Sequence, residues 1–164
     1  AQDNTSIPVT LVKTQDVKDV DAKGISTCAV LSNKSISCWG RNEYGQLGNG
    51  ITGGSNSVPV IVSGISNATE ITNGYRHACA VLDNKSAQCW GRNNQGQLGD
   101  GTLVDRNIPV AVTGVKNVVE IAPGYRHTCA LLDNDTVQCW GQNNQGQLGD
   151  GTTNSRTTPA EVQF

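Results

Sequence analysis

The sequence predicts an all-β protein built from repeated units of about fifty residues, each with four short strands. The first observation is a Cys-Trp pair that recurs with its tryptophans 51 and 50 residues apart, at Trp39, Trp90 and Trp140. The second is composition, because 19 of 164 residues are glycine and only 16% are charged, which suits short strands and many turns. The third is periodicity, since alternating or β-branched segments are bounded by Gly, Asn, Asp or Pro, and no window has helical periodicity with capping signals.

The predicted strands are clearest in the third unit, where they are 108–112, 118–122, 127–132 and 136–140. Four strands in about fifty residues is the size of a propeller blade. One repeat domain spanning 1–164 is therefore predicted, with blade 1 at about 7–40, blade 2 at about 58–91 and blade 3 at about 108–141.

Prolines add a further strand to this count. Four of them, spaced by 51, 50 and 50 residues, begin similar strands at Pro8, Pro59, Pro109 and Pro159. Because there are only three cysteine hairpins, residues 159–164 are predicted to be a surplus C-terminal strand. We expect the blades to remain open or to be completed by oligomerisation.

The six cysteines fall into three pairs of identical spacing with none left over: Cys28 with Cys38, Cys79 with Cys89, and Cys129 with Cys139. If Cys28 faces Cys38 in a hairpin, the loop is 32–34 and contains Asn33, a residue that tolerates the left-handed conformation. Facing Cβ atoms lie about 4.5–5.5 Å apart, close to disulfide reach. Three disulfides are favoured over free buried thiols, and over a His-x-Cys…Cys metal site that the first copy, with Ser26, could not form.

Residues 118–132 read Val-Val-Glu-Ile-Ala-Pro-Gly-Tyr-Arg-His-Thr-Cys-Ala-Leu-Leu, and Val-Gln-Cys-Trp-Gly-Gln-Asn and Gly-Gln-Leu-Gly-Asp-Gly-Thr follow. These segments resemble the regulator-of-chromosome-condensation repeat, and the cysteine-bearing form resembles its secreted bacterial branch. The resemblance implies a β-propeller, usually of seven blades, whose members bind proteins. A nuclear member exchanges guanine nucleotide on a small GTPase, and secreted members include enzyme inhibitors.

The chain departs from this family in two ways. Three blades cannot close a ring, because propellers have about four to eight. The first copy is also atypical, with Lys23 and Ser26 where the second copy has Gly74 and His77. Terminal repeats often differ because they have different neighbours.

Several function classes lose support from the residues present. A net charge of −2 without a basic run gives no case for nucleic acid or an anionic membrane, and no apolar run could span a bilayer. No nucleotide loop, nucleophile elbow or paired-carboxylate motif occurs, so we predict no enzyme, cofactor or metal. His77 and His127 are predicted to be buried and bonded to neighbouring backbone, while Asp100 and Asp150 are predicted to be turn residues.

The remaining candidate residues point to binding. Inter-blade packing is predicted for Trp39, Trp90 and Trp140, with stacking on sugars as the alternative. The dipeptides Tyr75-Arg76 and Tyr125-Arg126, in loops before the third strand of a unit, are the first candidates for partner contact. Five Asn-x-Ser/Thr triplets are candidate glycosylation sites, at Asn4, Asn33, Asn67, Asn84 and Asn134.

We therefore predict a non-enzymatic structural or adhesive protein, exported to the extracellular space or the cell surface. Head-to-tail self-association through blade faces and terminal strands would give a ring or a filament. The start at Ala1 would suit a mature chain after signal removal. The alternative is a secreted binding module, either a protein inhibitor or a lectin. A second alternative is a fragment of a longer propeller acting as a GTPase exchange factor.

Overall fold

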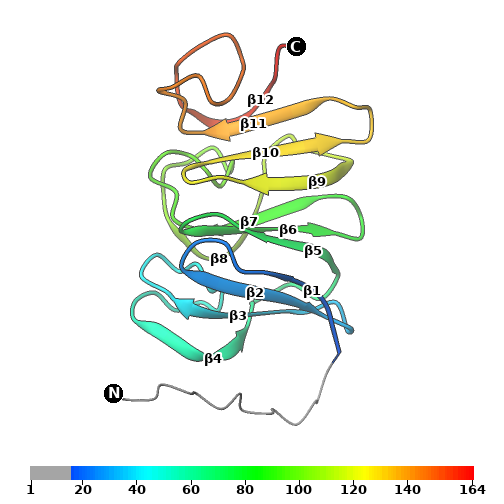
Figure 1. The fold of residues 1–164 in the computed structure, drawn as a ribbon, viewed down its shortest axis with the longest axis vertical. Helices are drawn as coiled ribbons and strands as arrows, with labels where there is room; N and C mark the ends of the chain where they lie inside the picture. Colours follow the sequence, from blue (N-terminus) through cyan, green and yellow to red (C-terminus); the bar gives the residue numbers. More distant parts are fainter. Residues whose placement is uncertain (1–15) are drawn as a thin grey trace, which may run out of the picture.

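The computed structural model describes residues 16–164, which contain twelve β-strands arranged as three four-stranded antiparallel sheets. The sheets are stacked in chain order along the long axis of the molecule (Figure 1). Asn4 and the predicted strand around Pro8 lie outside the described residues. Across residues 16–164 we find no helical segment with the length and apolar character of a membrane span.

Each sheet consists of four strands that are consecutive in the chain. The first sheet contains β1 (Val17–Asp21), β2 (Ser26–Leu31), β3 (Ile36–Arg41) and β4 (Ser55–Ile61). The second contains β5 (Ala68–Asn73), β6 (His77–Leu82), β7 (Ala87–Gly91) and β8 (Arg106–Ala111). The third contains β9 (Val118–Pro123), β10 (His127–Leu132), β11 (Val137–Gly141) and β12 (Arg156–Glu161).

The grouping of strands into sheets differs by one strand from the predicted blades. A predicted unit began with its proline-led strand, but β8, which contains Pro109, pairs with β7 of the hairpin before it, with Cys89 opposite Val110. Likewise β12, which contains Pro159, pairs with β11 as the outer strand of the third sheet, and so includes the first half, 159–161, of the strand predicted at 159–164. The loop after each hairpin folds the chain back, so that the proline-led strand pairs with the hairpin before it. Strand spacing alone does not reveal whether such a strand pairs with the hairpin before it or the one after it.

The cysteine hairpins have the predicted register. Cys28 lies opposite Cys38, and the other two pairs face each other in the same way. Three disulfides join the pairs Cys28–Cys38, Cys79–Cys89 and Cys129–Cys139. The left-handed loop residue, however, is Lys34 (φ 63°) rather than Asn33. The Asn33 carboxamide oxygen instead accepts hydrogen bonds from the Ser35 N–H (3.1 Å) and Oγ (2.7 Å).

Two apolar cores lie between the sheets. We call the face that packs on the following sheet the forward face, and the face that packs on the preceding sheet the back face. In the first core, forward-face residues such as Cys28 and Val30 meet back-face residues such as Ile71 and Trp90 of the second sheet. The second core repeats this arrangement, with Cys79 and Leu98 opposite Ile121 and Trp140. Because it is covered on both sides, β6 is buried along its whole length, whereas β10 alternates between buried and half-buried.

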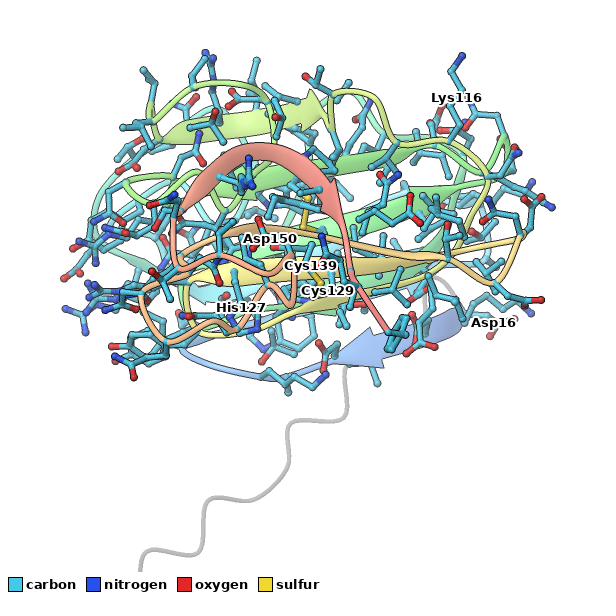
Figure 2. All side chains as sticks on the ribbon, turned by 90° about the horizontal axis from the view of Figure 1, so that it is seen from above. Asp16, Lys116, His127, Cys129, Cys139 and Asp150 are labelled. Carbon is cyan, nitrogen blue, oxygen red and sulfur yellow. A yellow bond between two sulfur atoms is a disulfide. The ribbon has the colours of Figure 1, made fainter. Side chains whose placement is uncertain are left out.

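Each end of the stack has one uncovered face among the described residues. On the back face of the first sheet, Val17 is 56% exposed and Val20 is 59% exposed. Trp39 on this face is half-buried, whereas its counterparts Trp90 and Trp140 are fully buried. At the other end, Figure 2 looks onto the forward face of the third sheet, where Cys129 and Cys139 are labelled. The three sheets of residues 16–164 therefore do not close into a ring.

Candidate binding surfaces

The predicted Tyr-Arg loops meet on one surface that crosses all three sheets. The loops before β6 and β10 bring the rings of Tyr75 and Tyr125 into a stack, with centroids 4.5 Å apart and planes 19° apart. The Arg76 guanidinium lies over the Tyr75 ring (5.1 Å) and also over the ring of Tyr44 (5.0 Å), and its Nη1 donates to the Tyr44 hydroxyl (2.8 Å). Arg126 lies over Tyr125 at 5.3 Å.

Sequence reasoning missed two members of this surface. Tyr44 follows β3 and Arg92 follows β7, and the Arg92 guanidinium lies 4.6 Å from the centroid of the Tyr44 ring. A signal was present, because Tyr44 is an aromatic residue at a position where the other copies have Gln95 and Gln145. We call Tyr44, Tyr75, Tyr125, Arg76, Arg92 and Arg126 together the tyrosine–arginine surface.

His77 lies inside the stack rather than at a surface site. His77 is fully buried between the second and third sheets, and its Nε2 lies 2.9 Å from Thr128 Oγ1. Because Thr128 Oγ1 donates to the Gln97 carbonyl (2.9 Å), the His77 Nε2 carries the proton and donates to Thr128. Its partner is thus a side chain of the next sheet rather than the neighbouring backbone that was predicted. Burial, and to a lesser degree the charge of His127, lowers the pKa of His77 to about 3, so this ring is neutral.

The glycine three residues before each histidine leaves room for the ring. A Cβ on Gly74 would lie 2.4 Å from His77 Cε1, and a Cβ on Gly124 would lie 2.4 Å from His127 Cε1. The first copy lacks both partners of this pair, having Lys23 and Ser26 instead. The copy that has a side chain at the glycine position is therefore the copy that has no imidazole.

Two of the tryptophans are internal and cannot stack on a sugar. The Trp90 Nε1 donates to the Gln46 carbonyl (3.0 Å) of the sheet before it, and Trp140 Nε1 donates to the Gln97 carbonyl (2.9 Å). Both indoles are fully buried, so neither offers a face to a ligand. Trp39 has no preceding sheet among residues 16–164.

The Gly-Asp-Gly-Thr loops are held together by their aspartates. Asp150 Oδ1 accepts from the Thr152 N–H (3.0 Å) and Oγ1 (2.8 Å), while Oδ2 accepts from Arg156 Nε (2.8 Å). The Thr152 hydroxyl, followed by Arg156, lowers the pKa of Asp150 to about 2. Asp100 makes the same contacts with Thr102 and Arg106. Within residues 16–164 no group of three or more His, Cys, Asp or Glu side chains is placed to hold a metal ion.

The tips of the three cysteine hairpins lie at the opposite ends of the hairpin strands from the Gly-Asp-Gly-Thr loops. They carry three of the candidate glycosylation triplets. Neighbouring tips are joined by ion pairs between Lys34 and Asp83 (3.1 Å) and between Lys85 and Asp133 (3.2 Å). The triplet asparagines Asn33, Asn84 and Asn134 are exposed, and each accepts from the Ser or Thr two residues later. Asn67 donates to Asp83 (2.9 Å).

Inter-sheet contacts near β1, β5 and β9, the first strand of each sheet, follow a repeated pattern. Asp19 accepts a hydrogen bond from the Ile71 N–H (3.1 Å), and Glu70 accepts one from the backbone of Ile121. At the tips, the Lys34 carbonyl accepts from the Ala68 N–H (3.0 Å) and the Lys85 carbonyl accepts from the Val118 N–H (2.9 Å). Each sheet thus offers carboxylate and carbonyl acceptors forward to backbone donors of the next sheet.

Two sequence models of the Regulator of chromosome condensation (RCC1) repeat match the chain. One matches residues 36–81, 89–131 and 134–164, and the other matches 17–46, 69–97 and 118–147. The ultraviolet-B receptor UVR8 of Arabidopsis thaliana is 37% identical over 82 residues, which are 49% of this chain and 19% of UVR8. The mouse secretion-regulating guanine nucleotide exchange factor is 37% identical over 81 residues, 39% of this chain and 17% of that protein. The matched segments therefore span about a fifth of the length of these relatives.

Solved structures show the same architecture. Human WBSCR16 superposes with a TM-score of 0.81 at 24% identity, covering 92% of this chain and 40% of that chain. Prp20p of Saccharomyces cerevisiae, which binds Gsp1p and histones, superposes with a TM-score of 0.82 at 18% identity, covering 90% and 38%. At these identities the likeness carries the fold alone, which is that of RCC1-type β-propeller blades. Together with the repeat matches over most of its length, it places this chain in the RCC1 repeat family.

Proposed function

We propose that the chain is a non-enzymatic structural or adhesive repeat protein that assembles head to tail, with the back face of one copy packed on the forward face of another. The observation that carries this proposal is that the two faces left uncovered within residues 16–164 hold residues of the same kinds, at the same repeat positions, as the two internal inter-sheet contacts. A ring or a filament would result, according to whether the rotation between copies closes.

The histidine–threonine pair gives the most specific match. Inside the chain, His77 on the second sheet donates to Thr128 on the third. The corresponding positions in the first internal contact are Ser26 and Ala78, where neither partner of the pair is present. At the open ends these positions are His127 on the forward face and Thr27 on the back face. A second copy would therefore pair an imidazole with a hydroxyl, as the second internal contact does.

Backbone and indole groups match as well. By the repeat register, Trp39 of one copy would donate to the Gln147 carbonyl of another, as Trp140 donates to the Gln97 carbonyl inside the chain. Glu120 corresponds to Asp19 and Glu70, and would accept from the Val20 N–H of the next copy.

The apolar surfaces are complementary too. Val17, Val20 and Trp39 on the back face correspond to core residues of the second and third sheets, and Leu131 and Val137 on the forward face correspond to Val81 and Ala87. Burying exposed apolar area stabilises an interface by about 25 cal/mol per Å² before the costs of association are counted. Exposed apolar faces of this kind are rarely left in water.

The assembly mode differs in one respect from the sequence-based expectation. The strand at 159–164 was expected to join another copy, but its first half belongs to β12, which already has β11 as its partner. Removing β12 would damage the third sheet itself, so its deletion would not be a specific test of assembly. The faces rather than this strand are the proposed contact.

Three disulfides are compatible with an oxidising compartment, which supports export to the extracellular space or cell surface. Glycosylation at the exposed tip asparagines Asn33, Asn84 and Asn134 belongs to the same proposal, since these side chains lie away from both blade faces. Mass spectrometry of the protein from its native source would detect or exclude such glycans.

Two variants with opposite faces blocked test the assembly. Thr27→Arg places a charge on the back face, and Leu131→Arg places one on the forward face. Each variant alone should be monomeric by multi-angle light scattering, and an equimolar mixture should form a dimer, because each partner keeps one intact face. Leu103→Arg, which alters an exposed loop residue, is the matched control and should assemble like the parent. A monomeric parent protein, or a mixture that remains monomeric, would exclude head-to-tail assembly.

A further inference from the structure

The tyrosine–arginine surface is distinct from the faces used in the proposed assembly. It is formed by loops at one end of the strands, and it contains all 3 tyrosines of the chain. The first copy of the repeat has Gly24 at the position of Tyr75 and Tyr125. In a head-to-tail assembly, Gly24 of the next chain would follow Tyr125, so no further ring would extend the stack. Tyr125 is 55% exposed.

Within the part of the chain that the structure describes, the cations on this surface lack ion-pair partners. Among residues 16–164, Arg76, Arg92 and Arg126 form no ion pair, whereas Arg106 and Arg156 are paired with Asp100 and Asp150. The Nε of Arg76 is buried without a hydrogen-bond partner in the described part of the chain. At the rim, Arg41 is paired with Glu43, and Arg76 already donates to the Tyr44 hydroxyl, which leaves the guanidinium groups of Arg92 and Arg126 available to an incoming anion.

The local charge is opposite in sign to that of the whole chain. Arg41, Arg76, Arg92 and Arg126, together with Glu43 and with Asp105, whose carboxylate accepts from the Asn93 N–H beside Arg92, give this surface a formal charge of +2. The whole chain has 12 basic and 14 acidic residues, so 8 basic and 12 acidic residues remain elsewhere, a formal charge of −4. A short anionic segment can bind the surface without approaching much of the acidic remainder, whereas a long polyanion such as DNA would be repelled by it.

We infer that this surface binds an acidic segment of a protein partner, with partner carboxylates accepting hydrogen bonds from Arg92 and Arg126, while Arg76 holds the Tyr44 ring in place and adds positive charge. A guanidinium that lies over a tyrosine ring keeps its N–H edge free, and its fork matches a carboxylate in a bidentate geometry. The rings hold the arginines in place, so less side-chain entropy is lost on binding. Tyrosine and arginine are also the residue types that dominate protein–protein contacts.

A labelled peptide of about twelve residues rich in glutamate and glycine is a suitable probe, with fluorescence anisotropy as the readout. Binding should be seen at low ionic strength and should weaken in physiological salt, as expected for partly exposed charges. Arg92→Gln and Arg126→Gln should each weaken binding by roughly tenfold, because each removes a charge-assisted hydrogen bond. Lys116→Gln removes the same charge from an exposed loop on another part of the molecule and should leave the affinity within about twofold.

Arg92→Lys separates a built site from simple charge attraction. It keeps the charge but removes the planar fork that lies over Tyr44, so it should bind nearly as weakly as Arg92→Gln. The inference is overturned if the peptide fails to bind at low salt, if Arg92→Lys binds like the parent protein, or if a DNA oligonucleotide of equal charge binds more tightly. Light scattering on the same variants should show unchanged assembly, so failure here can be told apart from failure of the head-to-tail proposal.

Discussion

The fit between Gly74 and His77 gives a stability prediction that can be worked through from the structure. In the Gly74→Ala variant, the new Cβ would lie 2.4 Å from His77 Cε1 and 2.6 Å from the carbonyl oxygen of Gly124. The imidazole cannot move aside easily, because it is fully buried and hydrogen-bonded to Thr128. One methyl group must therefore be accommodated by shifting two packed sheets.

The expected cost is about 1–3 kcal/mol, the usual range for overpacking a filled core. Gly124→Ala makes a similar short contact, but only with the ring of His127, which is half-buried at an open face and can rotate. We therefore expect Gly124→Ala to cost less than about 1 kcal/mol. Since Gly124 does not have a positive φ, replacing it in a His127→Ser background should be neutral or stabilise by up to about 1 kcal/mol, by reducing the entropy of the unfolded chain.

Urea unfolding followed by tryptophan fluorescence measures these differences, since Trp90 and Trp140 are both buried. The Thr27→Arg variant is the background of choice, because association would otherwise stabilise the folded state. A double-mutant cycle of Gly124→Ala with His127→Ser gives the coupling between the two residues. Equal costs for Gly74→Ala and Gly124→Ala, or a coupling of zero, would refute the explanation that these glycines exist to admit the histidine ring.

Three further predictions follow from the same contacts. The pKa of His77 is lowered to about 3 in the folded state, so below pH ~6.5 only the unfolded chain takes up this proton. The free energy of unfolding should therefore decrease by about 1.4 kcal/mol per pH unit as the pH falls below ~6.5. The His77→Gln variant should remove this slope in urea titrations between pH 4 and 7. Trp140→Phe should cost about 1–3 kcal/mol by losing a buried hydrogen bond and indole volume, whereas Trp39→Phe should leave monomer stability nearly unchanged and weaken assembly in light scattering. Replacing Cys79 and Cys89 by alanine should cost roughly 2–3 kcal/mol in urea unfolding, because a short cross-linked loop is released in the unfolded chain, and a loss below about 0.5 kcal/mol would contradict this account.

Much of the fold could be predicted because the repeat supplies three versions of each element. The strands β9, β10 and β11 lie within one residue of the predicted 118–122, 127–132 and 136–140. The facing cysteines followed from hairpin arithmetic alone. The pairing of β8 with β7 could not be predicted in this way, because a strand midway between two hairpins has the same local sequence whichever one it joins.

The binding surfaces were predicted only in part, because residue types identify single loops but not which loops meet. Tyr75, Arg76, Tyr125 and Arg126 were chosen from residue type and loop position. Tyr44 and Arg92 were missed, since a Tyr after β3 and an Arg after β7 come together only when two sheets are stacked. The left-handed position was misplaced at Asn33 for a local reason, because the asparagine side chain bonds to Ser35 while Lys34 takes the strained backbone.

The distribution of atypical residues within the first copy bears on what covers the back face of the first described sheet. A terminal repeat that faces water is expected to carry polar residues on its outer face. In the first sheet the substitutions Lys23 and Ser26 instead affect the internal contact with the second sheet, and the outer face keeps Val20, Thr27 and Trp39 at the positions used inside the stack. The outer face of the first sheet thus retains the residues of a covered surface. In the proposed assembly, a copy whose forward face ends in His127 would supply the matching cover, and this is the strongest physical reason to test the protein for head-to-tail association.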